Sequence, residues 1–311
     1  MKSILIIPIV LAAITVNAQY NKDNLRLEAK ATESKYKYQN LQLYPIRANN
    51  IFVKEHKDLG KFVTLKEALE KKKIAITEAN GGDVNKLFVE NTSKDTVMIL
   101  SGEVVQGGKQ DRMIGQDIIL YPKSGKKDLS VFCVEQGRWH SKGDGMDFKS
   151  YYSISSNEVR KAATVKKNQL EVWDKVAETT TKNNATTSTG TLAALKESGD
   201  FGKELKKYAD YFNPLIINEK DVIGVVAVSG DKILGCDMFA THDLFEKHYQ
   251  NLVGSYATEA ITNGKAAAVS YDKVQGYLMS VIEDETKQES EVQKKGTMLK
   301  DKGKKVHIST F

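Results

Sequence analysis

The segment from Ser101 to Gly145 concentrates the residue types that could bind or transform a ligand. It reads SGEVVQGGKQDRMIGQDIILYPKSGKKDLSVFCVEQGRWHSKGDG and contains a glycine pair, two arginines, two glutamates, a tryptophan and a histidine. Arginine recognises anions through paired hydrogen bonds, adjacent glycines expose backbone amides, tryptophan offers a stacking surface, and histidine exchanges protons near neutral pH. The candidate ligand-binding residues are Glu103, Gly107, Gly108, Gln110, Arg112, Glu135, Arg138, Trp139 and His140.

The same residues admit a purely structural interpretation. Glycines within strands often mark β-bulges, and beside such a bulge Arg112 would pair with Glu103 or Glu135. Trp139 would then close one end of the core while Arg138 neutralises a buried glutamate. A third interpretation is a hydrolase for a phosphorylated or glycosidic substrate, with Glu103 or Glu135 as acid–base and Arg112 as anion clamp. Glycosidic chemistry would require the two carboxyl groups to lie ~5 to 9.5 Å apart.

The other reactive residue types give weaker indications. Cys133 and Cys236 both lie in strand-like apolar contexts, where free cysteine behaves as a small buried hydrophobe, so a disulfide and two free thiols both stay open. The five histidines show no metal-ligand spacing, and we expect neither a metal site nor a cofactor. His242 opens a predicted helix and His248 lies six residues further on, so they do not share a helix face, and both are expected to be surface or core residues.

The N-terminus has the features of a secretory signal. Met1-Lys2 is a short positive start, Ile4 to Val16 is largely apolar, and small residues precede an expected cleavage site before Gln19. Residues 1–18 are therefore predicted to be a signal peptide, and the protein to be exported to the periplasm or the cell exterior. The apolar run is too short for a comfortable membrane span, and no second run of spanning length follows it.

The composition argues against a nucleic-acid partner. The formal net charge of +6 is mild, and the lysines are spread along the chain rather than gathered in one stripe. We expect no nucleic-acid partner, and the sequence does not indicate a protein partner.

Short apolar runs separated by turn residues dominate the first half of the chain. Strands are predicted within residues 41–53, 74–79, 86–91, 96–105, 117–121 and 129–135. Thr64 with Glu67 fits a capping box and predicts a short helix between the first two of these strands. Because parallel strands need long crossovers, the close spacing indicates antiparallel pairing in a β-sandwich or partly open barrel.

Helical patterns dominate the second half of the chain. Helices are predicted within residues 155–180, 204–212, 242–264 and 270–282. The run 221–240 predicts a β-hairpin around Ser229-Gly230-Asp231, and residues 307–311 predict a final strand. The expected fold class is α+β, with a β-rich subdomain over residues 19–145 and a helical and hairpin subdomain over residues 146–311, packed as one unit.

Several stretches resemble a known family. They are TLKEALEKKKIAITE, VNKLFVENTSKDTVMILSGEVVQGGKQDR and LSVFCVEQGRW, and the later GVVAVSGDKILGCDMF is also similar. The family is the ADP-ribosylglycohydrolase (ARG) and rhodanese-phosphatase-superfamily-associated protein domain, a domain of unknown function. The ordered motif GE…GGKQDR…CVEQGRW is specific, and the resemblance covers most of the chain beyond the signal segment. The family name implies a link to nucleotide-derived ligands rather than an activity.

These observations together predict an exported binding or interaction protein without catalysis. We expect the nine candidate residues to line one polar pocket for an anionic ligand, derived from a nucleotide or a sugar. The hydrolase described above is the alternative, and a surface module for protein partners is a third hypothesis. Geometry separates them, because a site needs these side chains converging on an open pocket, whereas a structural role buries and pairs them.

Overall fold

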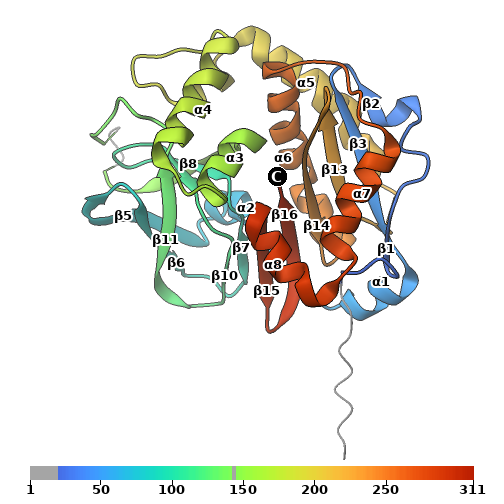
Figure 1. The fold of residues 1–311 in the computed structure, drawn as a ribbon. Coiled ribbons are helices and arrows are strands. Elements are labelled where there is room, and N and C mark those ends of the chain that lie inside the picture. The colour runs from blue at the N-terminus through green and yellow to red at the C-terminus, as the bar shows by residue number, and fades with distance from the viewer. Residues whose placement is uncertain (1–19, 142–144) are drawn as a thin grey trace, which may run out of the picture.

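A computed structural model describes residues 20–141 and 145–311 of the chain, with the backbone alone at Asn80 (Figure 1). The predicted signal peptide, residues 1–18, lies outside the described residues. Two groups of strands, each flanked by helices, make up the molecule, so the predicted α+β class is confirmed. Within the described ranges, no helix has the length and apolar character to cross a membrane.

A seven-stranded antiparallel sheet forms one half of the molecule. Its central strand β13 is buried along its whole length, with Val225 and Ala227 in the core on one face and Val226 and Val228 in the core on the other. A strand covered on both faces reads as a continuous apolar run, as VIGVVAVS does. In spatial order the strands are β1 (Leu25–Leu27), β3 (Leu41–Ala48), β13 (Val222–Ser229), β14 (Lys232–Phe239), β16 (Lys304–Thr310) and β15 (Gly296–Asp301), with β2 (Lys37–Tyr38) paired to β3.

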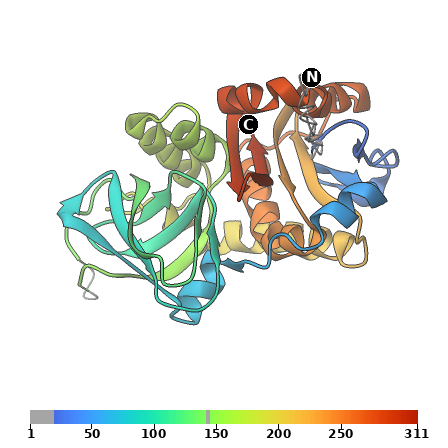
Figure 2. The same cartoon turned by 90° about the horizontal axis from the view of Figure 1, so that it is seen from below.

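Helices cover both faces of this sheet and make a three-layer arrangement, which Figure 2 shows edge-on. One face packs against α5 (Gly199–Phe212) and α6 (His242–Thr262), and the other packs against α1 (Asn50–His56), α7 (Tyr271–Ile282) and α8 (Glu285–Lys295). The long helix α6 begins at His242 because the Thr241 hydroxyl accepts a hydrogen bond from the Leu244 amide at 3.2 Å. Single helical turns precede β2 and follow α5, namely η1 (Ser34–Tyr36) and η3 (Asn213–Ile216).

A half-barrel forms the other half of the molecule. A six-stranded antiparallel sheet and a three-stranded sheet enclose an aliphatic core, and the short helix α2 (Leu65–Glu70) packs on that core through Leu65 and Ala68. In spatial order the larger sheet holds β12 (Phe148–Ile154), β8 (Glu103–Gly107), β9 (Arg112–Ile114), β11 (Gly125–Cys133), β6 (Lys86–Asn91) and β5 (Ile74–Asp83), and the smaller holds β10 (Ile118–Leu120), β7 (Val97–Ile99) and β4 (Val63–Thr64).

Three helical segments cover the outer face of the half-barrel. They are α3 (Asn157–Thr164), α4 (Gln169–Lys182) and the turn η2 (Leu192–Lys196). Their apolar side chains meet Val104 of β8, Met113 of β9 and Val134, which directly follows β11. The single helix predicted within residues 155–180 is thus two helices, because Asn168 caps a new helix by accepting from the Leu170 and Glu171 amides.

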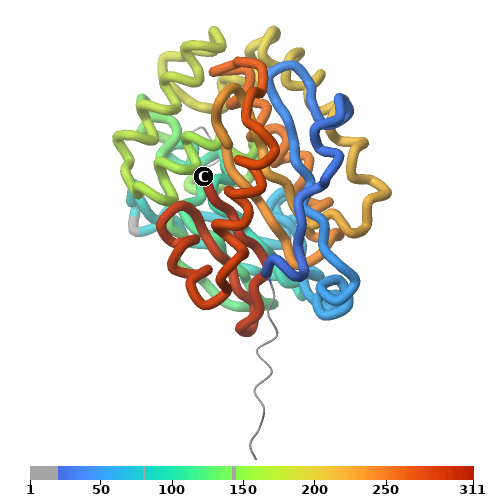
Figure 3. The backbone as a smooth tube through the Cα atoms, turned by 45° about the vertical axis from the view of Figure 1, so that its right-hand side comes forward, coloured from blue at the N-terminus to red at the C-terminus, as the bar shows by residue number. Residues whose placement is uncertain are grey.

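The half-barrel is inserted between two parts of the seven-stranded sheet. Strands β1 to β3 precede it in the chain, yet β3 pairs with β13, which follows it. Figure 3 shows the N-terminal segment (blue) running beside the C-terminal strands (gold to red). The two sheets therefore do not divide the chain at residue 145, and the prediction that residues 41–135 form one β unit is wrong for residues 41–48. Antiparallel partners far apart in sequence leave no local signal of which sheet a strand joins.

Most predicted elements are present, and the exceptions have local causes. The hairpin of β13 and β14, the helices α2, α5, α6 and α7, and the final strand β16 are confirmed. The strand predicted over residues 41–53 ends at Ala48, because the Asn49 side chain accepts from the Phe52 amide at 2.9 Å and starts α1. Cys133 and Cys236 are free, buried thiols that lie in different sheets.

A buried imidazole links the two halves. His307 on β16 donates from Nδ1 to Asp117, which precedes β10, and from Nε2 to Asp237 on β14, both at 3.1 Å. Burial alone would lower the pKa of His307, but the hydrogen bonds and charges of the two carboxylates raise it to about 9. Arg160 of α3 reaches the same Asp237 at 3.0 Å, so charges from both halves meet in one network.

We expect the stability of the protein to fall as the pH rises from about 6.5 to 9. The folded protein retains the His307 proton over this range whereas the unfolded chain releases it, so the stabilisation is complete below the unfolded pKa of 6.5 and is lost through the folded value of about 9. At about 1.4 kcal/mol per pKa unit, the loss is on the order of 3 kcal/mol. Urea unfolding between pH 6 and 9 measures it, and His307→Gln should make the profile less steep. A wild-type free energy of unfolding that stays constant over this range would contradict the link.

Candidate functional site

The glycine pair of the predicted site permits a close approach between strands. A Cβ atom on Gly107 would lie 2.3 Å from the Asp147 carbonyl oxygen, and one on Gly108 would lie 2.5 Å from the Phe148 ring. Gly108 also has φ of +46°, a region that side chains disfavour. The pair therefore lets β12 pack directly on the end of β8, and the Gly107 and Gly108 carbonyls are turned toward Arg138.

The guanidinium group of Arg138 is buried and donates hydrogen bonds to groups of the protein itself. Nε donates to Glu135 at 2.8 Å, Nη1 donates to the Gly108 and His140 carbonyls at 2.7 Å each, and Nη2 donates to Asp111 and the Gly107 carbonyl at 3.2 Å each. The side chain is 2% exposed. An arginine with this many internal acceptors has no donor left for a ligand.

Glu135 and Asp111 complete the same buried cluster. Glu135 accepts from the Asp111 amide at 3.0 Å, and Asp111 accepts from the Thr191 hydroxyl at 3.0 Å. Gln110 donates to the Glu135 carbonyl at 3.0 Å, which ties β9 to the end of β11. Burial would raise the pKa of Glu135, but the hydrogen bonds from Arg138 and the Asp111 amide lower it, so the carboxylate is charged near neutral pH.

Arg112 lies beside this cluster with fewer partners. Its Nη1 donates to Gln110 at 2.9 Å, and its Nη2 is 3.8 Å from a Glu78 carboxylate oxygen. Among the described residues, Nε and Nη2 have no hydrogen-bond partner, and burial lowers the pKa of the guanidinium. The guanidinium lies 5.7 Å from the Trp139 ring centroid, and Lys109 Nζ lies 5.1 Å from it. Trp139 is 46% exposed and does not close the core, so that part of the structural interpretation is wrong.

Glu103 is not part of the cluster. It is fully buried at the start of β8, where it accepts from the Leu100 amide at 2.7 Å, and burial raises its pKa to about 8. The charges that act on its pKa are those of Asp117, which raises it, and His307, which lowers it, both in the link between the two halves. Because folding raises the pKa of Glu103, the free energy of unfolding decreases as the pH rises from 4.5 to about 8. His307 changes the free energy of unfolding in the same direction. Glu103 and Glu135 thus belong to separate networks.

The structure therefore brings together eight of the nine predicted residues and leaves Glu103 in a separate network. Six of them, and the backbone carbonyl of His140, form the buried cluster, namely Gly107, Gly108, Gln110, Arg112, Glu135 and Arg138. The partly exposed Trp139 ring lies against Arg112, and the His140 side chain is exposed. Neither of the two cavities described next is lined by any of the nine.

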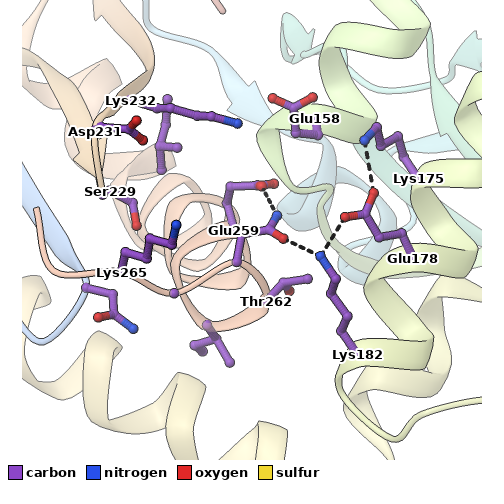
Figure 4. A pocket seen from close by; sticks show the side chains of 16 residues that line it. Glu158, Lys175, Glu178, Lys182, Ser229, Asp231, Lys232, Glu259, Thr262 and Lys265 are labelled. Atoms are coloured by element: carbon purple, nitrogen blue, oxygen red, sulfur yellow. Dashed lines mark hydrogen bonds and ion pairs between the residues drawn. The ribbon is translucent and has the colours of Figure 1, made fainter.

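One cavity, of about 690 Å³, lies at the C-terminal end of α6, and we call it the α6 C-terminal cavity (Figure 4). It is bounded by α4, by the last turn of α6 and by the turn between β13 and β14. Lys182 bonds Glu178 and Asn263 at 2.7 Å each, so one wall is internally paired. Four lysines face four acidic residues, and burial and Glu158 raise the pKa of Glu259. The charged side chains that line this cavity therefore balance one another.

A second cavity, of about 590 Å³, lies at the opposite end of the same helix, and we call it the α6 N-terminal cavity. It is bounded by residues 57–61 after α1, by Lys220 and Ile223 around the start of β13, and by residues 240–247. Gly60 has φ of +80°. Because Gly60 has no side chain, the loop packs closely against Leu244 and Thr241 at the start of α6. Four lysines face two acidic residues, so this cavity is electropositive.

His242 is the buried polar group of the α6 N-terminal cavity. It is 6% exposed, and its Nδ1 donates to the Val222 carbonyl at 2.7 Å. Its Nε2 has no hydrogen-bond partner in the part of the chain that the structure describes, and the nearest carboxylate oxygen, of Glu246, lies 3.9 Å away. From the sequence, His242 was expected to be a surface or core residue at a helix start, and its unpaired ring nitrogen was not predicted, because its partner Val222 lies on another element. The one available signal was a histidine next to the Thr241 cap at a helix start.

We expect Arg138→Ala to destabilise the protein by about 3 to 5 kcal/mol, because it leaves buried carboxylates without their cation. Lys127→Ala provides a matched control, since Lys127 is exposed on the neighbouring strand β11, and it should change the free energy of unfolding by less than about 0.5 kcal/mol. Chemical denaturation measures both variants. A loss below about 1 kcal/mol for Arg138→Ala would show that the cluster is not structural.

Comparison with known proteins gives one match. No curated protein and no solved structure matches the chain. The model of a single family matches residues 31–310, which span both the half-barrel and the seven-stranded sheet. The resemblance seen in the GGKQDR and CVEQGRW stretches is thereby confirmed, and the match extends beyond those motifs to every strand of the seven-stranded sheet except β1. The chain belongs to the ARG and Rhodanese-Phosphatase-superfamily-associated Protein domain family.

Proposed function

We propose that the protein is an exported, non-catalytic binding protein for a small anionic ligand, and that the ligand occupies the α6 N-terminal cavity. The observation that supports this most directly is the convergence of cationic and donor groups on one open space. Four lysines, the first amides of a 21-residue helix and the His242 ring surround about 590 Å³, a volume within the usual range for small-molecule sites.

The helix start contributes its own attraction for anions. The first amides of a helix have no intrahelical acceptor, and the aligned peptide dipoles place about half a positive charge at this end. Thr241 satisfies the Leu244 amide, and the residues before Leu244 at the start of α6 line the cavity. Asp243 and Glu246 reduce the positive charge of the cavity, but Lys57 and Lys61 form no ion pair with the described residues. The local charge therefore favours an anion.

The α6 C-terminal cavity is larger but fits an anion less well. Its charges are balanced, and it faces the end of α6 where the backbone dipoles place negative charge. Glu158 and Glu259 both border it, and an anion there would lie against two carboxyl groups. The electrostatics thus favour the smaller cavity.

Binding rather than catalysis is proposed because the acid–base residues of a hydrolase are enclosed. Glu103 and Glu135 are both 0% exposed and lie in separate networks, and Arg112 lines neither cavity. A substrate would therefore reach none of the three without a rearrangement of the half-barrel. Nucleotide- and sugar-derived anions are the first ligands to test.

Replacing Lys57 and Lys61 together by glutamine should weaken binding of such anions at least tenfold, equivalent to about 1.4 kcal/mol. Isothermal titration of the purified protein measures the affinity, which should also fall with added salt because exposed charges are screened. Lys203→Gln on α5 is the control, since Lys203 is equally exposed but lines neither cavity. Equal affinities for the double variant and this control would refute the assignment of the site.

Export has a separate test. We expect the mature protein to begin at Gln19, because the apolar segment ends in small residues before that position. Intact-mass measurement of the protein recovered from its native cells should give the mass of residues 19–311. Recovery of the uncleaved chain from the cell interior would contradict export while leaving the binding proposal unaffected.

A further inference from the structure

We infer that the anion recognised in the α6 N-terminal cavity is a phosphate monoester carrying a small apolar group. This inference rests on the function proposed above and narrows it from anions in general to one chemical class. It follows from two features of the cavity, the hydrogen-bonding state of His242 and the composition of the opposite wall.

His242 distinguishes among anions by its tautomer. A neutral imidazole donates from one nitrogen and accepts at the other. The Val222 carbonyl can only accept, so Nδ1 carries a proton, and Nε2 of the neutral ring presents a lone pair. Nε2 is buried and has no partner among the described residues, so a ligand in the cavity must offer it an O–H or N–H group to satisfy it.

A phosphate monoester supplies both kinds of group. Its second pKa is near 6, so one oxygen readily carries a proton while the others remain anionic. The P–O–H group donates to Nε2, and the anionic oxygens accept from the α6 amides and the lysines. Transfer of that proton to Nε2 gives the reverse arrangement, imidazolium and dianion, with the same atoms in contact. A carboxylate or a sulfate ester has no proton to offer at neutral pH, so it satisfies Nε2 only if the ring takes up a proton from solvent.

The charges facing this position come from three segments of the chain. Lys57 and Lys61 extend from the loop after α1, Lys220 precedes β13, and Lys247 lies on α6, where its Nζ donates to the Phe62 carbonyl at 2.9 Å. Asp243 and Glu246 are the acidic groups on the same helix, and Lys220 lies 4.0 Å from Glu246. The excess of two positive charges matches a phosphate dianion better than a singly charged sulfate ester.

The remaining wall of the cavity indicates an apolar substituent. Val53, Leu59, Ile223 and Ala240 line it, and among these Val53 is 41% exposed. Inorganic phosphate would leave this wall in water, whereas an alkyl or phenyl group would cover it. Among the described residues that line the cavity there is no tyrosine, phenylalanine or tryptophan, and thus no such ring on which a nucleotide base would stack.

The experiment compares phenyl phosphate, phenyl sulfate and inorganic phosphate by isothermal titration against the purified protein at pH 7.5. We expect phenyl phosphate to bind at least tenfold more tightly than either of the others. His242→Asn retains a donor at the position of Nδ1 for Val222 and removes Nε2, so it should abolish the preference for phosphate over sulfate. Val53→Ser should weaken phenyl phosphate several-fold and leave inorganic phosphate unchanged.

The outcomes separate this inference from the function on which it rests. If phenyl sulfate binds as tightly as phenyl phosphate, and the Lys57/Lys61 double variant weakens both, the anion site stands and the phosphate assignment is wrong. If His242→Asn melts at the wild-type temperature and keeps the full phosphate preference, the role of Nε2 is wrong. If none of the three anions binds, both proposals fail.

Discussion

His307 is held between two carboxylates that belong to different halves of the molecule, and this contact constrains how the halves fit together. Asp117 leads into the smaller sheet of the half-barrel, whereas Asp237 lies in the seven-stranded sheet. Arg160, from the helices that cover the half-barrel, bonds Asp237 and Ser309, and the Tyr256 hydroxyl of α6 donates to the same carboxylate. Two anions and two cations are thus neutralised in the interior only when both halves are in place. Buried charge of this kind is costly if any partner is lost, so it restricts the arrangement of the halves more than it adds stability.

The charged residues of the half-barrel motifs are also buried and paired with one another. Arg138 donates hydrogen bonds to Glu135, Asp111 and three backbone carbonyls. The glycine pair is required because β12 occupies the space that a side chain at either position would fill. Arginines, glutamates and glycines at strand ends are equally typical of an anion site and of a structural cluster. Burial decides between them, and burial is a property of the packed chain. The motif that identifies the family is in this respect a structural signature of the half-barrel.

The parts of the fold that were predictable are those with local causes. The β13–β14 hairpin follows from two apolar runs around Ser229-Gly230-Asp231, and α2 follows from the Thr64 cap. The membership of β3 in the seven-stranded sheet was not predictable, because its partner β13 begins more than 170 residues further along the chain. The internal cluster around Arg138 was predicted as a grouping of residues, since β8, β9 and β11 are neighbours in both sequence and space. The burial of this cluster was not predicted, because the residues that cover it come from β12 and from the segment around Thr191.

Helix α6 connects the two cavities and gives them opposite character. Its 21 residues span about 30 Å, with the positive end of the backbone dipoles at His242 and the negative end at Thr262. The side chains reinforce this difference, because lysines outnumber acids at the first end and balance them at the second. The same helix packs through its middle, Leu252 and Tyr256 among others, against the core of the seven-stranded sheet, so neither end can move independently of that sheet. A ligand that bound at the first turn of α6 would therefore contact a helix that is packed on the sheet, and the Tyr256 hydroxyl ties that helix to the Asp237 network.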